Sequence, residues 1–403
     1  MSDKNVFVFV VCGENSHIQK LNNALKFLKH FSALPIIVIT DSRRNKITIE
    51  HDNIIDVSTA AELNHHQASI FLKTSLHKVL DTTNNYCYLD SDVLALSPKV
   101  NDIFKQQYGQ VTFAADHCTI QSFSPYALNC GCLQNKENNL KIFIEAVQKY
   151  FPDYVYNDFY HNDKARELNR MINKVKNNIY ENPVALFKYL WNLYMPLKNL
   201  KFKIELNNEF RYIPHKDAWF DFHNNCLMYM LSSYYKTIQK DTGFIFNKRK
   251  QTWLNREGEN IEYPKCTHLL DAIKHTFNVD VKDKNYKHWN GGVFLFNKDA
   301  ANFMETWHKN TLKTFKMALW KTRDQGTLVA SVWQLGLQSQ KVLPKEFNFI
   351  ADYYNTDITY HKELGFTNDN FNTSIKPFFI HVFHEYGNKN WDIWKAIEAY
   401  LIL

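Results

Sequence analysis

A strand–helix–strand pattern near the start of the chain constrains the fold more than any other feature of the sequence. Val6–Val11 is a continuous apolar run, typical of a strand that is buried on both faces. Ser16–His30 then carries apolar residues at helical spacing, and Pro35–Thr40 is a second apolar run. Two buried strands joined through a helix lie parallel in one sheet. The sequence therefore predicts an α/β fold.

This alternation continues to about residue 116 and then stops. Before that point, strands are predicted at Ile54–Val57, Tyr86–Leu89 and Val111–Ala115, and a helix at His65–Leu80. The segment 122–287 is irregular, mostly helical in pattern and rich in Asn, Lys and aromatic residues. Regular signals return with strands at Gly292–Phe296 and Phe378–Val382 and helices at Asp299–Lys316 and Gln325–Leu335. We expect two core parts, 1–116 and 288–403, around a large, mostly helical insertion at 117–287.

The composition excludes several classes of protein. With 45% hydrophobic residues in 403, the chain can bury a core and is not intrinsically disordered. No apolar run approaches the roughly 20 residues that a membrane-spanning helix needs. Val6–Cys12 is too short for the apolar part of a signal peptide. We expect a soluble, cytoplasmic protein without a membrane span.

Seven cysteines are scattered along the chain: Cys12, Cys87, Cys118, Cys130, Cys132, Cys226 and Cys266. No two of them form a Cys-x-x-Cys pair, and the spacing of a zinc ribbon is absent. Their odd number also argues against a disulfide framework, which fits a reducing compartment. We therefore expect free thiols, most of them buried.

Much of the positive charge lies in one stretch. The chain has a formal net charge of +7, and the stretch 160–203 alone holds nine lysines and arginines against three acidic residues. Aromatic residues such as Tyr180, Trp191 and Phe202 are interleaved with them. A basic, aromatic surface can bind nucleic acid or another phosphate-rich polymer. An amphipathic helical pair with solvated lysines explains the same pattern, and we favour this second interpretation.

The strongest candidate for a functional site is Asp90-Ser91-Asp92, which directly follows the predicted strand Tyr86–Leu89. Ligand sites in open parallel sheets lie at the carboxyl ends of strands. Two carboxylates one residue apart can both reach a hard divalent cation there, and Mg²⁺ or Mn²⁺ leaves positions open for phosphate oxygens. The pattern predicts a site for a divalent cation and a phosphorylated ligand. Two exposed turn carboxylates are the alternative.

The segment YCYLDSDVLAL, with Lys73 in the helix before it, resembles the metal-binding strand end of GT-A fold glycosyltransferases. The similarity is greatest to glycosyltransferase family 8, of the glycogenin and bacterial lipooligosaccharide galactosyltransferase type. Four further segments match this family in its order: FAAD ending at Asp116, WNGGVFLFNKD at Trp289–Asp299, RDQGTL at Arg323–Leu328 and IHVFHEYGNKNW at Ile380–Trp391. Together the segments cover roughly residues 4–116 and 288–391.

The resemblance implies a GT-A fold, which is a Rossmann-like mixed sheet flanked by helices. Its first part, 1–116, would bind the nucleotide sugar. It implies an enzyme that moves a hexosyl or pentosyl group from a nucleotide diphosphate sugar, by family default a UDP-sugar, with retention of configuration. Mn²⁺ or Mg²⁺ would bridge the diphosphate and offset the charge that develops on it. The insertion would form the acceptor side.

The resemblance also implies a metal site made by Asp90, Asp92 and a late histidine. His384 fits the family's His-x-x-Gly spacing, whereas His381 lies directly on the predicted strand, and we prefer His384. The ending is one residue shorter than the family pattern and lacks its proline. A core histidine with a hydrogen bond is the alternative for either of them.

Other residues receive roles in the same way. Lys389 would add a cation beside the leaving diphosphate, and Gly291 and Gly292 would bring backbone close to the sugar. Further contacts to the donor would come from Lys73, Ser91 and Gly387. The candidate catalytic residues are Asn290, Asp324 and Gln325. Asn129 begins a similar Asn-Cys-Gly segment, but GVFLF and the downstream Asp-Gln pair follow Asn290, which we prefer.

The base of the nucleotide would be held after the first strand, where this chain has Cys12, Gly13 and Asn15. These differ from the family's usual residues, so the identity of the base stays open. Asp41, at the end of the second strand, is a candidate contact to the base or ribose. It equally fits a residue that caps the turn before Arg43.

One rival function is a haloacid-dehalogenase-like phosphatase with Asp90 as nucleophile. That family also needs a later acidic motif, which this sequence lacks, so we prefer glycosyl transfer. The acceptor stays open. The basic insertion admits a polyanionic acceptor, such as nucleic acid or a phosphorylated glycan, as readily as a protein.

Overall fold

A computed structural model describes residues 4–152 and 204–401, and within 153–203 only 154, 156 and 168. Short gaps in this description fall at 82, 207–208, 214–215, 217, 230, 232–233, 248–251, 322, 352–357, 363–364, 369–372 and 383. The chain forms two compact units. Residues 1–133 and 265–403 make the first unit, and Gln134–Pro264 makes the second. The second unit therefore lies inside the expected insertion of 117–287 and is shorter at both ends.

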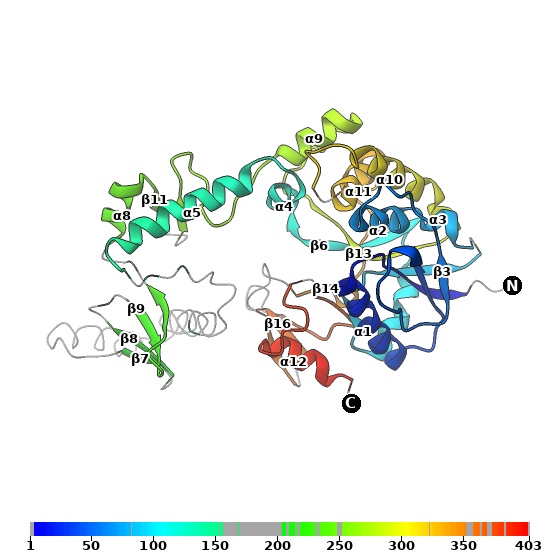
Figure 1. The fold of residues 1–403 in the computed structure, drawn as a ribbon, viewed down its shortest axis with the longest axis horizontal. Coiled ribbons are helices and arrows are strands. Elements are labelled where there is room, and N and C mark those ends of the chain that lie inside the picture. The colour runs from blue at the N-terminus through cyan, green and yellow to red at the C-terminus, as the bar shows by residue number, and fades with distance from the viewer. Residues whose placement is uncertain are drawn as a thin grey trace. The chain divides into compact units, whose positions relative to one another are not determined.

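The first unit is built on a six-stranded sheet in the order β3-β2-β1-β4-β13-β6 (Figure 1). Its strands are β3 (Ile54–Asp56), β2 (Ile36–Thr40), β1 (Asn5–Val10), β4 (Asn85–Leu89), β13 (Lys287–Phe296) and β6 (Val111–Thr119). The first four run parallel, and β13 is antiparallel to both of its neighbours. This arrangement confirms the predicted α/β class with a mixed sheet. The strands predicted near Ile54, Tyr86, Val111 and Gly292 are all present.

Strand β1 shows why the sheet is buried on both faces. Phe7 and Phe9 belong to one hydrophobic core, and Val8 and Val10 to another, because successive side chains of a strand point to opposite faces. Helices α1 (Asn15–Phe31) and α12 (Asp392–Ala399) cover the first face. Helices α2 (His65–Thr74), α10 (Ala301–Thr314) and α11 (Arg323–Gln334) cover the other and lie together in Figure 1.

A small sheet in the order β14-β18-β5 lies at the end of β4 and brings distant segments together. It consists of β14 (Phe349–Ile350), β18 (Phe379–His381) and β5 (Val93–Ala95).

The rest of the first unit comprises α3 (Leu76–Val79), α4 (Ile120–Ala127), α9 (His268–Phe277), β15 (Ile358–His361), β16 (Gly365–Asn368), β17 (Thr373–Ile375), and the 3₁₀ helices η1 (Ser42–Arg44), η2 (Pro98–Gln106), η5 (Lys298–Ala300) and η6 (Lys345–Phe347).

The second unit contains more strand than the sequence predicted. Its described part has a four-stranded antiparallel sheet in the order β10-β9-β8-β7 and a hairpin of β11 and β12. These strands are β7 (Ile204–Leu206), β8 (Phe210–Ile213), β9 (Ala218–Asp221), β10 (Cys226–Tyr229), β11 (Ile245–Asn247) and β12 (Thr252–Leu254). Helix α5 (Cys132–Gln148) leads into the unit, and α8 (Tyr235–Thr242) lies within it. The expectation of a mostly helical insertion therefore missed six short strands.

The basic, aromatic stretch 160–203 falls outside the described residues, apart from the buried Leu168. Its proposed contact with a polyanion therefore stays a prediction from sequence. In the part of the chain that the structure describes, we find no helix with the length and apolarity needed to cross a bilayer.

Candidate functional site

Strand β4 delivers Asp90 to the carboxyl edge of the central sheet. The Asp90 backbone N–H donates to the Gly292 carbonyl at 2.8 Å, which fixes the residue against β13. The Tyr88 hydroxyl donates to Asp90 Oδ1 at 2.6 Å. Tyr88 and Asp90 are two residues apart in extended backbone, so their side chains lie on the same face. The edge of the sheet thus holds the Asp90 carboxylate in one orientation.

The small sheet brings His381 to Asp92. Val93, directly after Asp92, is paired with His381 across β5 and β18. The Val382 N–H also donates to the Asp92 carbonyl at 2.9 Å. His381 Nε2 consequently lies 3.3 Å from Asp92 Oδ1. Asp90, Asp92 and His381 each offer one ligand atom, and the three atoms lie within 4.8 Å of one another.

Asn348 orients the buried ring of His381. Ile350 on β14 pairs with His381, so Asn348 just before that strand lies beside the imidazole. Asn348 Oδ1 is 3.2 Å from His381 Nδ1, and its amide group donates to Asn290 Oδ1 at 3.1 Å. Since that amide already donates, its oxygen is the acceptor, and Nδ1 carries the proton. Nε2, which faces Asp92, is then the ring nitrogen that can bind a cation.

Charges in the site compensate one another. Burial alone would raise the pKa of Asp92, but the neighbouring His381 lowers it below its usual range. Burial would likewise lower the pKa of His381, and Asp92 raises it instead. Lys20 on α1 adds a second cation, with its Nζ 3.7 Å from Asp92 Oδ2. The Asp92 carboxylate therefore lies between the His381 imidazole and the Lys20 ammonium.

Helix α2 supplies Lys73. The helix begins with a capping box in which Asn64 and Gln67 bond each other's backbone N–H, and Lys73 lies in its last turn. Lys73 Nζ is 3.1 Å from Asp90 Oδ1 and 3.3 Å from Asp324 Oδ2. Burial opposes the charge of this ammonium, but the two carboxylates outweigh it and raise the Lys73 pKa. Lys73 therefore stays protonated at neutral pH and ties the two carboxylates together.

The start of α11 places Asp324 and Gln325 across from the sheet. The Trp307 indole N–H donates to the Asp324 carbonyl at 2.9 Å. The Gly291 N–H donates to Gln325 Oε1 at 3.1 Å, and the Gln325 amide group donates to the Trp289 carbonyl. Gln325 thus locks α11 to β13, and the neighbouring Asp324 side chain projects toward Lys73.

Asn290 connects three parts of the site. Its amide group donates to Asp116 Oδ2 at 3.0 Å, and its Oδ1 accepts from the Gly292 N–H at 2.9 Å and from Asn348. Asn290 is largely buried and lies on β13, in the central sheet. Asn129, the other candidate from sequence, lies away from that sheet and donates to the Ala318 carbonyl.

A cavity of about 200 Å³ opens at this edge of the sheet. Five of the residues expected at the site line it: Lys73, Asp90, Ser91, Asp92 and Asp324. Val10 and Val11 line it from the end of β1, and His17 and His66 from the starts of α1 and α2. The structure thus brings the carboxylate pair, the buried lysine and the start of α11 around one space.

The residues after β1 adjoin this cavity through Val11. Cys12 is fully buried, and Asn15 begins α1. Gly13 has a φ of +83°, and a Cβ on it would lie 1.9 Å from His65 Nδ1. Glycine is therefore required at this turn on two grounds: its backbone conformation and its close contact with α2.

Asp41 is fully buried at the end of β2 and already has several partners. Arg43 and Arg44 both bond its carboxylate, and the backbone N–H and hydroxyl of Thr59 donate to it at 2.7 Å. These bonds, that from Arg43 above all, hold the pKa of Asp41 far below its usual value. These bonds explain why a carboxylate is buried at this position: Asp41 stabilises the turn after β2. No ligand is needed to explain it.

Three expected residues follow β18 in the turn before α12. His384 is half-buried three residues beyond His381, and it is not part of the three-residue group with Asp90 and Asp92. Gly387 has a φ of +78°, and Lys389 is exposed. None of these three residues lines the cavity among the described positions.

Sequence reasoning missed several residues of the site. Tyr88 had a usable signal, because it precedes Asp90 by two residues in a strand and must share its face. Lys20 lies on the first helix after β1, but many lysines do. Asn348 carries no motif, and its position depends on the pairing of β14 with β18.

No family model matches the chain, and no curated protein matches it in sequence. The apo structure of the bifunctional glycosyltransferase WbbM shares 10% identity over 100% of this chain and 50% of its own, with a TM-score of 0.44. The apo form of mouse xyloside xylosyltransferase 1 shares 10% identity over 96% of this chain and 98% of its own, with a TM-score of 0.37. The galactosyltransferase LgtC, in complex with donor and acceptor sugar analogs, shares 10% identity over 98% of this chain and 95% of its own, with a TM-score of 0.39. The chain thus spans half the length of the first of these, and the likeness is distant in all three.

Proposed function

We propose that the protein is a metal-dependent glycosyltransferase that takes its sugar from a nucleotide diphosphate sugar, with a UDP-sugar as the expected donor. The observation that carries this proposal is the convergence of Asp90, Asp92 and His381, because both carboxylates of this group line one cavity. They stand at the carboxyl edge of a mostly parallel sheet, where such folds bind nucleotides. The buried Lys73 and a third carboxylate, that of Asp324, line the same cavity.

The residues present fit a divalent cation. Two carboxylates and one imidazole suit Mn²⁺ or Mg²⁺, and a nitrogen ligand is more readily accepted by Mn²⁺. The hydrogen bond from His381 Nδ1 to Asn348 Oδ1 leaves Nε2 as the ligand atom. When bound, the cation would stabilise the negative charge on the departing nucleoside diphosphate.

The chain's own groups would hold the donor on either side of that cation. Lys73 keeps its charge and braces Asp90 and Asp324, so both carboxylates stay in place when substrate enters. A side chain at Gly291 would crowd these groups, since a Cβ there would lie 3.3 Å from Gln325 Oε1 and 3.4 Å from Lys73 Nζ. We assign the cavity lined by Lys73, Asp90 and Asp324 to the donor and its transferred sugar.

Among the candidate catalytic residues, Asp324 is the one whose carboxylate lines the cavity. We propose that it contacts a hydroxyl of the sugar or of the acceptor. Gln325 and Asn290 are bonded within the protein, and we assign them the role of positioning Gly291, Gly292 and His381. Retention of configuration, implied by the family resemblance, belongs to the same proposal.

The phosphatase alternative is not favoured. A nucleophilic Asp90 must approach phosphorus freely, whereas this carboxylate bonds Tyr88 and Lys73 and shares a ligand group with Asp92 and His381. The acceptor stays open, and a polyanion bound through the stretch 160–203 is the hypothesis from sequence.

Product release tests the proposal directly. Purified protein is incubated with single UDP-sugars and Mn²⁺, and free UDP is quantified with and without chelator. We expect slow, Mn²⁺-dependent release of UDP from one donor even without an acceptor, because water can take the place of the acceptor and hydrolyse the donor. Asp324→Asn should lower this release while leaving UDP binding intact. Phosphate release from simple phosphomonoesters, with every UDP-sugar left intact, would contradict the proposal.

A further inference from the structure

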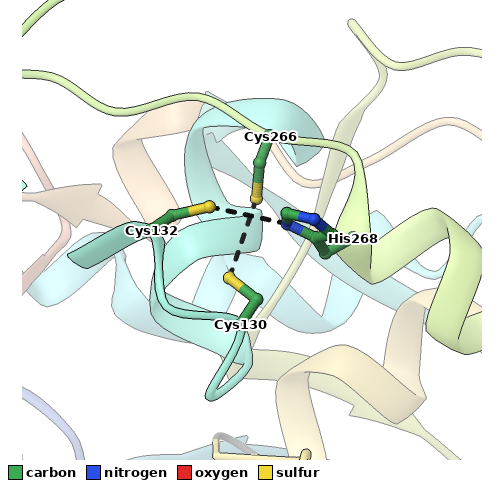
Figure 2. Close-up of side chains that lie close together, drawn as sticks. All are labelled: Cys130, Cys132, Cys266 and His268. Atoms are coloured by element: carbon green, nitrogen blue, oxygen red, sulfur yellow. Dashed lines mark hydrogen bonds between the residues drawn. The ribbon is translucent and has the colours of Figure 1, made fainter. Parts of the chain in front are cut away.

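A group of Cys and His side chains that could hold a metal ion lies apart from this site. Cys130 and Cys132 stand at the start of α5, and Cys266 and His268 at the start of α9 (Figure 2). Each side chain offers one ligand atom, and all four atoms lie within 4.8 Å of one another. Figure 2 shows the three sulfurs and the imidazole pointing toward a common centre.

The spacing of these atoms matches a tetrahedral ion. Cys130 Sγ lies 4.0 Å from Cys266 Sγ, and Cys132 Sγ lies 3.5 Å from His268 Nδ1. At zinc–sulfur and zinc–nitrogen distances of about 2.3 and 2.0 Å, the ligand atoms of a tetrahedral zinc ion stand roughly 3.5–3.8 Å apart. The Cys130–Cys266 and Cys132–His268 separations are within a few tenths of an ångström of these values, and the other pairs of ligand atoms lie no more than 4.8 Å apart.

The backbone is shaped to present both thiols of the first pair. Gly131 between them has a φ of +82°, and a Cβ on it would meet nothing within 4 Å. Glycine is therefore required by the left-handed turn and not by lack of space. Because of this turn, the side chains of Cys130 and Cys132 point to the same side at the start of α5.

Helix α4 holds the second pair in place. The Cys266 N–H donates to the Gln121 carbonyl at 3.0 Å, and the Leu269 N–H donates to Ser124 Oγ at 2.9 Å. Ser124 Oγ is also 3.0 Å from Cys266 Sγ. Since Ser124 accepts from Leu269, its own proton is available to a Cys266 thiolate, as expected of a residue that supports a metal ligand.

The frame around the four ligands is a packed core. Ile120 and Ala127 of α4 and Leu269 and Ile273 of α9 are buried in one cluster with residues of α11. The ligands therefore project from rigid elements, which lowers the entropic cost of collecting them around an ion.

We propose that Cys130, Cys132, Cys266 and His268 hold one structural Zn²⁺. Three thiolates and an imidazole are soft ligands that select zinc, whereas the carboxylates of the first site select Mn²⁺ or Mg²⁺. Four protein ligands close the tetrahedron and leave no position for substrate, so the site is structural. This inference is independent of the proposed transferase activity.

The position in the chain indicates what the ion does. Cys130 and Cys132 come just before the second unit begins at Gln134, and Cys266 and His268 come just after it ends at Pro264. Zinc would tie together the two points where the chain leaves the first unit and returns to it. Because metal binding then closes a long loop, its free energy also stabilises the fold around α4 and α9.

The alternative to a bound metal ion is a disulfide between two of these cysteines. None of the seven cysteines, all of which the structure describes, is in a disulfide, and the sulfurs of Cys130 and Cys266 are about twice as far apart as bonded sulfurs, which lie about 2.05 Å from each other. Oxidation of this pair after loss of the metal is therefore feasible, and the experiment separates the two states.

The metal content of the purified 403-residue chain tests the proposal. We expect close to one zinc per chain by plasma mass spectrometry, retained through dialysis and released when a mercurial reagent titrates the thiols. Cys132→Ser and His268→Ala should lose most of the zinc. Cys226→Ser is the matched control, because this cysteine lies on β10 outside the group, and it should keep the wild-type content.

Cobalt gives a readout that does not depend on a stable variant. Wild-type protein grown or refolded with Co²⁺ should show the intense visible bands of tetrahedral cobalt and a thiolate charge-transfer band, and Zn²⁺ should displace both. Octahedral cobalt without a charge-transfer band, zinc content in Cys132→Ser equal to that in Cys226→Ser, or a Cys130–Cys266 disulfide in protein purified under reducing conditions would each overturn the proposal.

Discussion

His381 Nε2 lies 3.3 Å from Asp92 Oδ1, although the two residues are far apart in the sequence. The contact follows from one strand pair, since β5 begins directly after Asp92 and His381 ends β18 opposite Val93. Backbone pairing of this kind fixes the ring more firmly than a loop would. The metal site that we propose is therefore set by sheet register.

His381→Ala should abolish most of the Mn²⁺ dependence of nucleotide binding, whereas His384→Ala should leave it nearly unchanged. The reason is that His381, and not His384, belongs to the group with Asp90 and Asp92. Calorimetric titration of UDP with and without Mn²⁺ measures the difference. A larger loss in His384→Ala would return the ligand to the residue that the sequence spacing favoured.

Asn348→Ala should weaken Mn²⁺ binding about 10–100-fold, because loss of the acceptor at Nδ1 frees the ring and its tautomer. Asn348→Asp keeps the acceptor for Nδ1 but loses the donor to Asn290, so it should weaken Mn²⁺ binding less than Asn348→Ala does. Direct titration with Mn²⁺, followed by electron paramagnetic resonance, measures both variants. Equal weakening in the two would mean that Asn348 only supports the fold.

Gly292→Ala should also impair metal binding, since its Cβ would lie 2.4 Å from His381 Cε1 and 3.0 Å from Asn290 Oδ1. Both neighbours are buried and bonded, so the imidazole must shift. Gly109→Ala is the matched control, because its Cβ would meet the flexible end of Gln340 at 2.5 Å, far from the site. Mn²⁺ affinity that is unchanged in Gly292→Ala would show that the ring can move freely.

Asp41→Asn should lower the free energy of unfolding at pH 7 by about 1–3 kcal/mol, the range for charged hydrogen bonds made by a buried group. The exposed Asp52→Asn is the control and should change it by less than about 0.5 kcal/mol. Urea unfolding at several pH values measures both. If Asp41 were instead a nucleotide contact, UDP affinity would fall while stability stayed constant.

The pH dependence of this effect has a definite sign. The pKa of Asp41 is depressed in the folded chain, so its stabilising contribution is present above the unfolded value of about 3.9 and is lost as the pH falls through the folded value. The difference between wild type and Asp41→Asn should therefore narrow below about pH 4. A constant difference down to pH 3 would contradict this account.

Hydrophobic periodicity was enough to predict the central sheet. Runs such as Val6–Val11 and Gly292–Phe296 are apolar throughout because both faces of their strands are buried. The second unit was harder, because strands of three or four residues such as β7 and β9 are too short to show a period. Their alternation is lost among aromatic residues that also fit a helix.

The candidate site also contains residues that could be predicted from the sequence and residues that could not. Asp90 and Asp92 are separated by one residue and directly follow a strand, so this strand was enough to single them out. The choice between His381 and His384 depends on which of them the pairing of β5 with β18 places beside Asp92. The spacing of residues along the chain does not show this. Cys130 and Cys132 gave no zinc signal, because their partners Cys266 and His268 lie beyond the whole second unit.

The central claim is that a divalent cation links the chain to a nucleoside diphosphate through Asp90 and Asp92. Calorimetric titration of UDP into wild type, Asp90→Asn and Asp92→Asn, each with and without Mn²⁺, tests it most directly. We predict binding to wild type only with Mn²⁺ and a loss of at least about tenfold in each variant, worth about 1.4 kcal/mol or more, with unchanged far-UV circular dichroism. UDP binding that is equal with and without Mn²⁺, or equal in all three proteins, would contradict it.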